Sequence, residues 1–115
     1  MLELTDNDFH ETLAQLEWVL VDYWADWCAP CKRLKPILES LVPEFPEITF
    51  ATLDTDNNET QTLAAGMSSL PTLILFHHGV SVGKLVGVHG KEFLKGWIAE
   101  LREIYGDDRD VPGTL

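Results

Sequence analysis

The 115-residue sequence is poor in positive charge and in cysteine. Eight lysines and arginines stand against nineteen acids, so the formal net charge is −11 at pH 7. A protein this acidic is repelled by phosphate backbones and by anionic membrane surfaces, which argues against nucleic acid and membranes as partners. There are only two cysteines, so disulfides cannot be the main source of stability.

Long apolar runs are also lacking. No stretch approaches the ~18 apolar residues of a membrane helix, and the first residues show no basic region followed by an apolar one. We therefore expect a soluble, cytoplasmic protein. Thiols are kept reduced in the cytosol, where a cysteine pair is more often catalytic or metal-binding than structural.

Apolar residues make up 45% of the sequence, which is typical of a globular chain. Their periodicity predicts strands over 2–4, 19–24, 48–53, 72–76 and 80–86, and helices over 6–16, from the cysteines to about 42, 57–65 and 90–105. This order predicts an α/β fold, with a central mixed β-sheet flanked by helices on both faces. We expect one domain over residues 1–106 and a flexible tail over 107–115.

The strands over 72–76 and 80–86 are separated by a short polar segment. His78-Gly79 is a plausible tight turn, so the two strands should form an antiparallel hairpin. We expect His77 and His78 to be exposed at this corner and assign them no role. The final helix should place one apolar side on the core, made of Leu94, Trp97, Ile98, Leu101, Ile104 and Tyr105.

Cys28 and Cys31 stand where a predicted strand gives way to a helix. If Cys28 is at or near the N-cap, the free N–H groups of the first turn and the helix dipole favour its thiolate. Cys31 lies one turn further in, where it should be shielded and remain a thiol. Residues three apart are helical neighbours, so the two sulfurs can be bonded or released without moving the fold. This arrangement favours reversible two-electron chemistry.

Two other uses of the pair are less favoured. A metal site normally draws four ligands, and the histidines show no paired ligand spacing; they are His10, His77, His78 and His89. A purely structural disulfide across two residues would close too small a loop to stabilise the fold much. We therefore expect redox chemistry and no metal.

Asp22 is the one acid in the strand over 19–24. It shares a strand face with Leu20 and Trp24, so we expect it to point into an apolar layer, where desolvation raises its pKa. The alternative is a solvated acid near the end of the strand.

Two stretches carry a resemblance to a known family. They are Val19-Leu20-Val21-Asp22-Tyr23-Trp24-Ala25-Asp26-Trp27-Cys28-Ala29-Pro30-Cys31-Lys32 followed by Pro36, and Leu70-Pro71-Thr72 followed by Gly79 and Gly87. They resemble the signatures of the thioredoxin family, and the resemblance extends over about residues 4–105. It implies the thioredoxin fold and the reduction of protein disulfides. It further implies no tightly bound cofactor, because NADPH acts only indirectly, through a thioredoxin reductase.

The resemblance also implies roles for individual residues. Cys28 is the nucleophile, Cys31 is the resolving cysteine of a redox-active disulfide, and Asp22 takes or supplies the proton of Cys31. Pro71 is expected to be cis and packed against the cysteines. An apolar substrate-binding surface is then expected from Trp27, Ala29, Pro30, Leu70, Gly87 and Val88. For Trp27 and Val88 the alternative is ordinary core packing.

Three residues depart from the family pattern. Ala29 replaces a usual glycine, which should strengthen the start of the helix by up to ~1 kcal/mol. Thr52 stands where many members have a lysine near the buried acid, so we expect an even higher pKa for Asp22 than in those members. Ser69 stands where a glycine is common. The last two departures bear on substrate range and pKa.

Three cations cluster after the cysteines, at Lys32, Arg33 and Lys35. A basic spot beside the thiolate of Cys28 would favour its charged form and help acidic partners dock. A solvated helix face is an equally good interpretation.

The expected partners are disulfide-containing proteins and a thioredoxin reductase, and we expect a monomer. Two alternatives differ in function. One is a thioredoxin-like binding module or chaperone subunit that needs no disulfide exchange, and the other is a dedicated reductase for a single target protein. The cysteine pair, Asp22 and Pro71 together argue against the binding module, because a scaffold needs none of the three.

Overall fold

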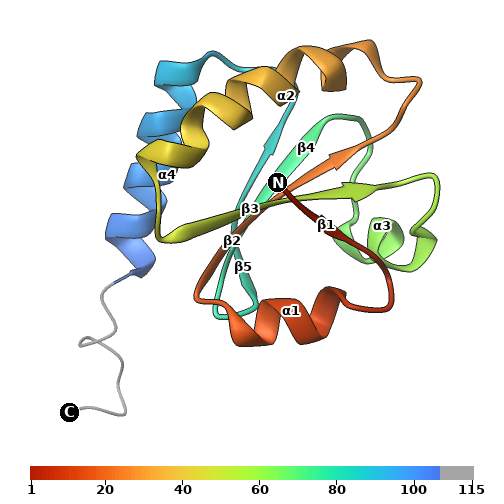
Figure 1. The fold of residues 1–115 in the computed structure, drawn as a ribbon, viewed down its shortest axis with the longest axis horizontal. Helices are drawn as coiled ribbons and strands as arrows, with labels where there is room; N and C mark the ends of the chain where they lie inside the picture. The colour runs from red at the N-terminus through yellow and green to blue at the C-terminus, as the bar shows by residue number, and fades with distance from the viewer. Residues whose placement is uncertain (107–115) are drawn as a thin grey trace.

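A computed structural model describes residues 1–106 (Figure 1). The expected tail over 107–115 lies outside the described residues. The strands are β1 (Leu2–Leu4), β2 (Trp18–Trp24), β3 (Ile48–Asp54), β4 (Thr72–His77) and β5 (Val80–Val86). The helices are α1 (Phe9–Gln15), α2 (Ala29–Leu41), the short 3-10 helix η1 (Val42–Glu44), α3 (Glu59–Ala65) and α4 (Lys91–Tyr105). Among these residues, every helix is too short or too polar to cross a membrane.

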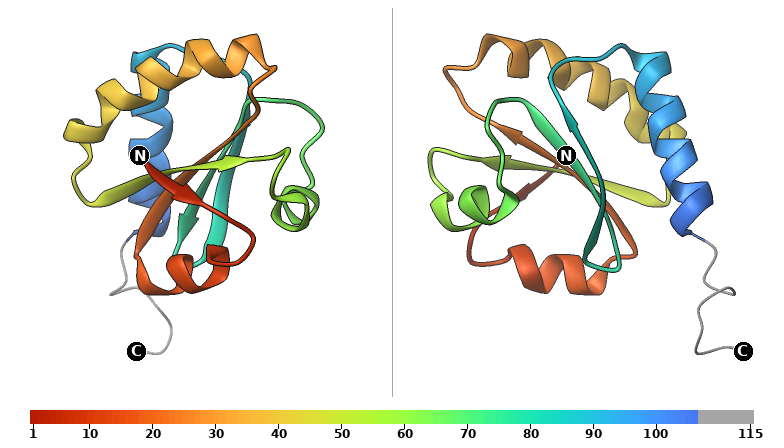
Figure 2. Two further views of the ribbon diagram at one scale, coloured as in Figure 1. Left: turned by 45° about the vertical axis from the view of Figure 1, so that its right-hand side comes forward. Right: turned by 180° about the vertical axis from the view of Figure 1, so that it is seen from behind.

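The five strands form one mixed sheet in the order β1-β3-β2-β4-β5. β3 pairs in parallel with β1 and β2, whereas β4 is antiparallel to both β2 and β5. Helices α2 and α4 cover one face and α1 and α3 the other (Figure 2). The predicted α/β fold, a central mixed sheet flanked by helices on both faces, is confirmed.

β2 lies at the centre of the sheet and is buried on both faces, which explains its nearly continuous apolar sequence. Leu20 packs into the core beneath α2 and α4, with Leu34 and Leu94 among its neighbours. Val19 and Val21 point the other way, into the core beneath α1. This central strand fixes the position of the residues that follow it, including both cysteines.

Helix α1 begins at Phe9, later than the predicted residue 6, and the side chain of Asp6 contacts another helix. The carboxylate of Asp6 accepts hydrogen bonds from the backbone N–H groups of Thr60 (3.2 Å) and Gln61 (2.9 Å). Those N–H groups lie in the first turn of α3, where helical partners are lacking. Asp6 therefore stabilises a helix more than fifty residues away along the chain.

The predicted hairpin is confirmed, since β4 and β5 are antiparallel and His78 (φ 49°) and Gly79 (φ 78°) both have positive φ in the turn between them. The expectation that His77 is exposed is wrong. His77 is the last residue of β4 and is only 9% exposed. Its ring stacks on the indole of Trp18, with 4.0 Å between the ring centroids.

The last turn of α4 also departs from prediction. Leu94 and Ile98 are fully buried as expected, but Ile104 and Tyr105 are exposed. The apolar stripe continues along the helix beyond the part that the sheet covers. Gly106 directly follows the helix, as predicted.

Candidate active site

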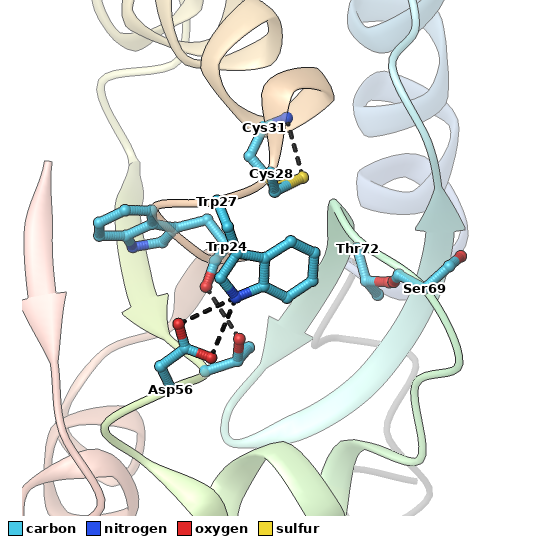
Figure 3. Close-up of a disulfide and its surroundings, with 8 residues drawn as sticks. Trp24, Trp27, Cys28, Cys31, Asp56, Ser69 and Thr72 are labelled. Atoms are coloured by element: carbon cyan, nitrogen blue, oxygen red, sulfur yellow. Dashed lines mark hydrogen bonds between the residues drawn. A yellow bond between two sulfur atoms is a disulfide. The ribbon is translucent and has the colours of Figure 1, made fainter.

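The two cysteines lie just beyond the carboxyl end of β2. Cys28 is the N-cap of α2, and its Sγ accepts a hydrogen bond of 3.2 Å from the backbone N–H of Cys31 (Figure 3). The Cα atoms are 5.3 Å apart and the sulfurs are bonded as a disulfide. Pro30 lies in the first turn, where its missing N–H has no helical partner to lose. The predicted N-cap position of Cys28 is confirmed.

Burial does not distinguish the two cysteines in the disulfide state. Cys31 is 3% exposed, so its expected shielding is confirmed, but Cys28 is equally buried at 4%. Both pack with Ala25, and Trp24 and Leu70 lie against them. The asymmetry between the sulfurs comes instead from the hydrogen bond, because a backbone N–H directed at Cys28 Sγ stabilises negative charge on that atom alone.

Asp22 is buried within β2, as predicted, and its Oδ1 has no hydrogen-bond partner among the described residues. Burial raises the pKa of this carboxyl to about 7, whereas the charge of Lys35 acts in the opposite direction and lowers it. A carboxyl with this pKa can gain or lose a proton near neutral pH. This is the property that a general acid or base requires.

A cavity of about 400 Å³ connects Asp22 with Cys31. The remaining lining residues are mostly polar: Met1, Glu3, Trp24, Asp26, Lys32, Lys35, Glu39 and Thr52. Asp22 is buried and its pKa is raised by desolvation, as predicted, but on this side it faces a cavity with polar lining residues. Water fits a cavity of this size and polarity, so a proton can pass between the carboxyl and the sulfur without direct contact.

Lys35 was not assigned to Asp22 by sequence reasoning. Thr52 lies beside Asp22 in the paired strand β3 and offers no charge, but Lys35 lines the same cavity from α2 and lowers the pKa of the acid. The expectation from Thr52 left out this cation, which partly offsets the rise in the pKa of Asp22. The sequence spacing could have predicted this contact. Lys35 is four residues after Cys31 and so lies one helical turn further along the same face.

The loop before β4 lies against the cysteines. The Leu70–Pro71 peptide bond is cis, as expected, and Leu70 packs on the cysteine pair. The backbone oxygen of Pro71 accepts a hydrogen bond of 2.9 Å from the N–H of Gly87, whose φ of 94° favours glycine. The structure therefore brings Leu70, Pro71 and Gly87 together, as predicted.

Trp27 and Val88, for which core packing was the alternative, differ in their exposure. Trp27 is 71% exposed, which excludes core packing. Its Nε1 donates to the carboxylate of Asp56 at 3.0 and 3.3 Å (Figure 3). Val88 is half-buried and packs against the core beneath α2 and α4, as its alternative interpretation expected. Sequence reasoning missed Asp56, because nothing local to it indicates a tryptophan twenty-nine residues away.

Comparison with known proteins agrees with this arrangement. The family model described as thioredoxin matches residues 1–100. A thioredoxin of Chlamydia pneumoniae is 39% identical over 98 residues, which cover 85% of this chain and 96% of that protein. A thioredoxin of Mycobacterium tuberculosis is 41% identical over 95 residues, covering 81% and 82%. A solved structure of Plasmodium falciparum thioredoxin superimposes with a TM-score of 0.81 at 31% identity, covering 87% of this chain and 98% of that one.

Proposed function

Because this chain belongs to the thioredoxin family, it catalyses thiol–disulfide exchange at Cys28 and Cys31, and we propose how its residues divide that work. Cys28 is the nucleophile, Cys31 resolves the intermediate, and Asp22 handles the proton of Cys31. The observation that carries the proposal is the N-cap position of Cys28, whose Sγ accepts the Cys31 N–H. A binding module that needs no exchange is not favoured.

The reaction begins with the reduced pair. The thiolate of Cys28 attacks one sulfur of a substrate disulfide, which breaks the substrate S–S bond and forms a mixed disulfide, and the released substrate thiolate takes a proton. Cys31 then loses its proton and attacks Cys28 Sγ. The mixed disulfide breaks, the second substrate sulfur leaves as a thiolate and takes a proton, and the Cys28–Cys31 disulfide remains. Two electrons have passed from the pair to the substrate.

We propose that Asp22 accepts the proton that Cys31 must lose. The carboxyl and the Cys31 side chain line one cavity, and a pKa of about 7 lets the group be a base at neutral pH and hold the proton afterwards. In the reverse direction the same carboxyl returns the proton. Asp22 acts on the resolving step, whereas the backbone N–H acts on the attacking sulfur.

The oxidised pair must be reduced again for turnover. A protein of Mycobacterium leprae that is 41% identical over 95 residues is named a bifunctional thioredoxin reductase/thioredoxin, and these residues make up 21% of it. By analogy, a thioredoxin reductase is the proposed electron donor for this chain. NADPH then acts only through that enzyme, and no cofactor is tightly bound here.

We also propose that the protein is cytoplasmic and monomeric.

The proposed substrate surface surrounds the sulfurs. Trp27 is exposed and held by Asp56, Ala29 is exposed, and Leu70 covers the cysteines. An extended substrate segment can pair with the backbone at Leu70 as an added strand while its apolar side chains contact this surface. Pro30 and Gly87 complete it, and Val88 supports it from the core. Contacts of this kind accept many sequences, so a general reductase is favoured over one dedicated to a single target.

Trp27→Ala is expected to raise KM for a protein disulfide by about tenfold or more, because exposed tryptophans often dominate protein contacts. The rate with a small aromatic disulfide should change much less, since that substrate needs only the sulfur. Tyr105→Ala removes an exposed aromatic side chain from the end of α4 and is the matched control. Equal losses with the large and small substrates would remove Trp27 from the docking surface.

Alkylation of the reduced protein tests the proposed division of roles. At neutral pH, iodoacetamide should modify Cys28 about tenfold or more faster than Cys31, because a capped thiolate stays charged where a free cysteine is mostly protonated. Mass spectrometry after brief labelling identifies the modified residue. Equal and slow reaction of both thiols, as in a free cysteine, would contradict the proposal.

A further inference from the structure

Three potential metal ligands meet at the end of the sheet opposite the cysteines. Glu17 directly precedes β2, His77 ends β4, and His78 starts the turn into β5. β2 runs from this end, beside α1, toward the loop that leads into α2 (Figure 1). A seven-residue strand spans roughly 20 Å, so this group lies far from the disulfide and takes no part in its chemistry.

The side chains of the three residues converge. His77 Nε2 lies 3.2 Å from Glu17 Oε2, and His78 Nε2 lies 3.9 Å from the same oxygen. The imidazole centroids are 4.3 Å apart. One ligand atom from each residue lies within 4.8 Å of the other two. Two imidazoles and a carboxylate thus surround one point in space.

These distances match the coordination of a small transition metal. Zinc binds imidazole nitrogen and carboxylate oxygen at about 2.0–2.2 Å in tetrahedral geometry, which places the ligand atoms roughly 3.3 Å from each other. The separations of 3.2 and 3.9 Å between Glu17 Oε2 and the two imidazole nitrogens lie on either side of this value. Small rotations of the exposed Glu17 and His78 side chains therefore suffice. Two histidines and one carboxylate are also a known zinc ligand set that leaves a fourth position open.

The backbone holds the three residues together independently of their side chains. The N–H of His78 donates a hydrogen bond of 2.7 Å to the backbone oxygen of Glu17. Trp18 and His77 are direct partners in the β2–β4 ladder, and their rings stack. His77 is consequently fixed by packing, and His78 by the tight turn. A preorganised set of ligands loses little conformational entropy on binding.

We propose that Glu17, His77 and His78 form a binding site for a divalent transition metal of the zinc class. Imidazole with carboxylate suits zinc and copper, whereas magnesium and calcium prefer oxygen ligands alone. Binding tethers the segment before β2 to the β4–β5 hairpin. The site is separate from the redox function and does not depend on it.

Titration of the oxidised full-length chain with Zn²⁺ tests the site. The Cys28–Cys31 disulfide removes the thiols as competing ligands, so calorimetry should detect one Zn²⁺ per chain at this site. Trace Cu²⁺ locates the site by NMR, because its unpaired electron broadens nearby resonances. Broadening should concentrate at Glu17, the Trp18 indole and the two histidines, and spare the cysteines.

Two variants test the ligands while keeping the fold. His78→Asn retains a residue suited to the positive φ of the turn, and Glu17→Gln changes an exposed side chain. Each should weaken Zn²⁺ binding by about tenfold or more. Even mutation of residues that only hydrogen-bond to metal ligands commonly lowers metal affinity 10- to 100-fold. His89→Asn, which replaces a histidine at the other end of the sheet, should bind as the unchanged protein does.

The same measurements could also contradict the proposed metal site. The proposal is overturned if the oxidised protein binds no Zn²⁺, if both ligand variants bind as tightly as the unchanged chain, or if broadening centres on His10, His89 or other carboxylates. In the first case, the 3.2 Å contact between Glu17 and His77 is structural and does not mark a metal site. Melting temperatures without metal show whether each variant folds, so a loss of binding is not confused with unfolding.

Discussion

Cys28→Ser is expected to abolish the reduction of protein disulfides, because it removes the only sulfur that carries the N-cap hydrogen bond and begins the exchange. Cys31→Ser should instead complete the first step and stop. Without a resolving thiol the mixed disulfide has no internal route to release, so the covalent complex accumulates. The two substitutions are thus expected to block different steps: Cys28→Ser the initial attack, and Cys31→Ser the release of the mixed disulfide.

The measurement follows NADPH consumption with a thioredoxin reductase and a protein disulfide, and detects mixed disulfides by mass spectrometry. Ser69→Ala, which changes a side chain in the loop before β4, is a control and should retain turnover. Undiminished turnover of Cys28→Ser would show that another group attacks the substrate. Trapping by Cys28→Ser in place of Cys31→Ser would reverse the assignment of the two roles.

Asp22→Asn is expected to stabilise the fold at alkaline pH. The folded-state pKa of about 7 exceeds the ordinary value of 3.8, so the folded chain binds more protons than the unfolded chain between those values. The free energy of unfolding of the natural chain therefore falls as pH rises from about 4 to about 7. The total loss is on the order of 4–5 kcal/mol, at about 1.4 kcal/mol per pKa unit between 3.8 and about 7.

An asparagine has almost the same shape but never ionises, so the variant avoids this loss. Its advantage in urea unfolding should be present in full above about pH 7 and disappear near pH 4. An advantage that is the same at pH 4 and pH 8 would show that packing, and not ionisation, is responsible. An NMR titration midpoint for Asp22 near the ordinary value would also contradict the explanation.

Lys35 offers a matched comparison for the same carboxyl. Lys35→Gln removes the cation that lowers the pKa of Asp22, so its titration midpoint should rise further and the loss of stability should extend to higher pH. Lys32 lines the same cavity, but its charge is not among the causes of the shift. Lys32→Gln should move the midpoint less.

The same asparagine variant should slow resolution of the mixed disulfide. General acid–base groups contribute on the order of 10²- to 10⁴-fold, and water can replace part of this proton transfer, so we expect about a tenfold to hundredfold decrease near neutral pH. Rapid-quench detection of the mixed disulfide separates this step from the initial attack. The rate of the attack by Cys28 should change little, because Asp22 acts on the other sulfur.

Local sequence predicted most of the secondary structure and the centre of the active site. β2 was recognisable because a strand buried on both faces is apolar at nearly every position. Cys28 was predictable as a cap because the change from strand to helix occurs within a few residues. The cis peptide at Pro71 required the family resemblance, since only a few per cent of bonds before proline are cis.

The sequence by itself therefore determined the order of elements, the fold class and the dithiol, because each depends on residues within a few positions of one another. The tertiary structure decided which distant side chains meet. Asp6 caps α3, Lys35 modifies the acid in β2, and His77 lies against Glu17 across sixty residues. Such contacts depend on how strands and helices pack in three dimensions. The periodicity of apolar residues along the chain does not determine that packing.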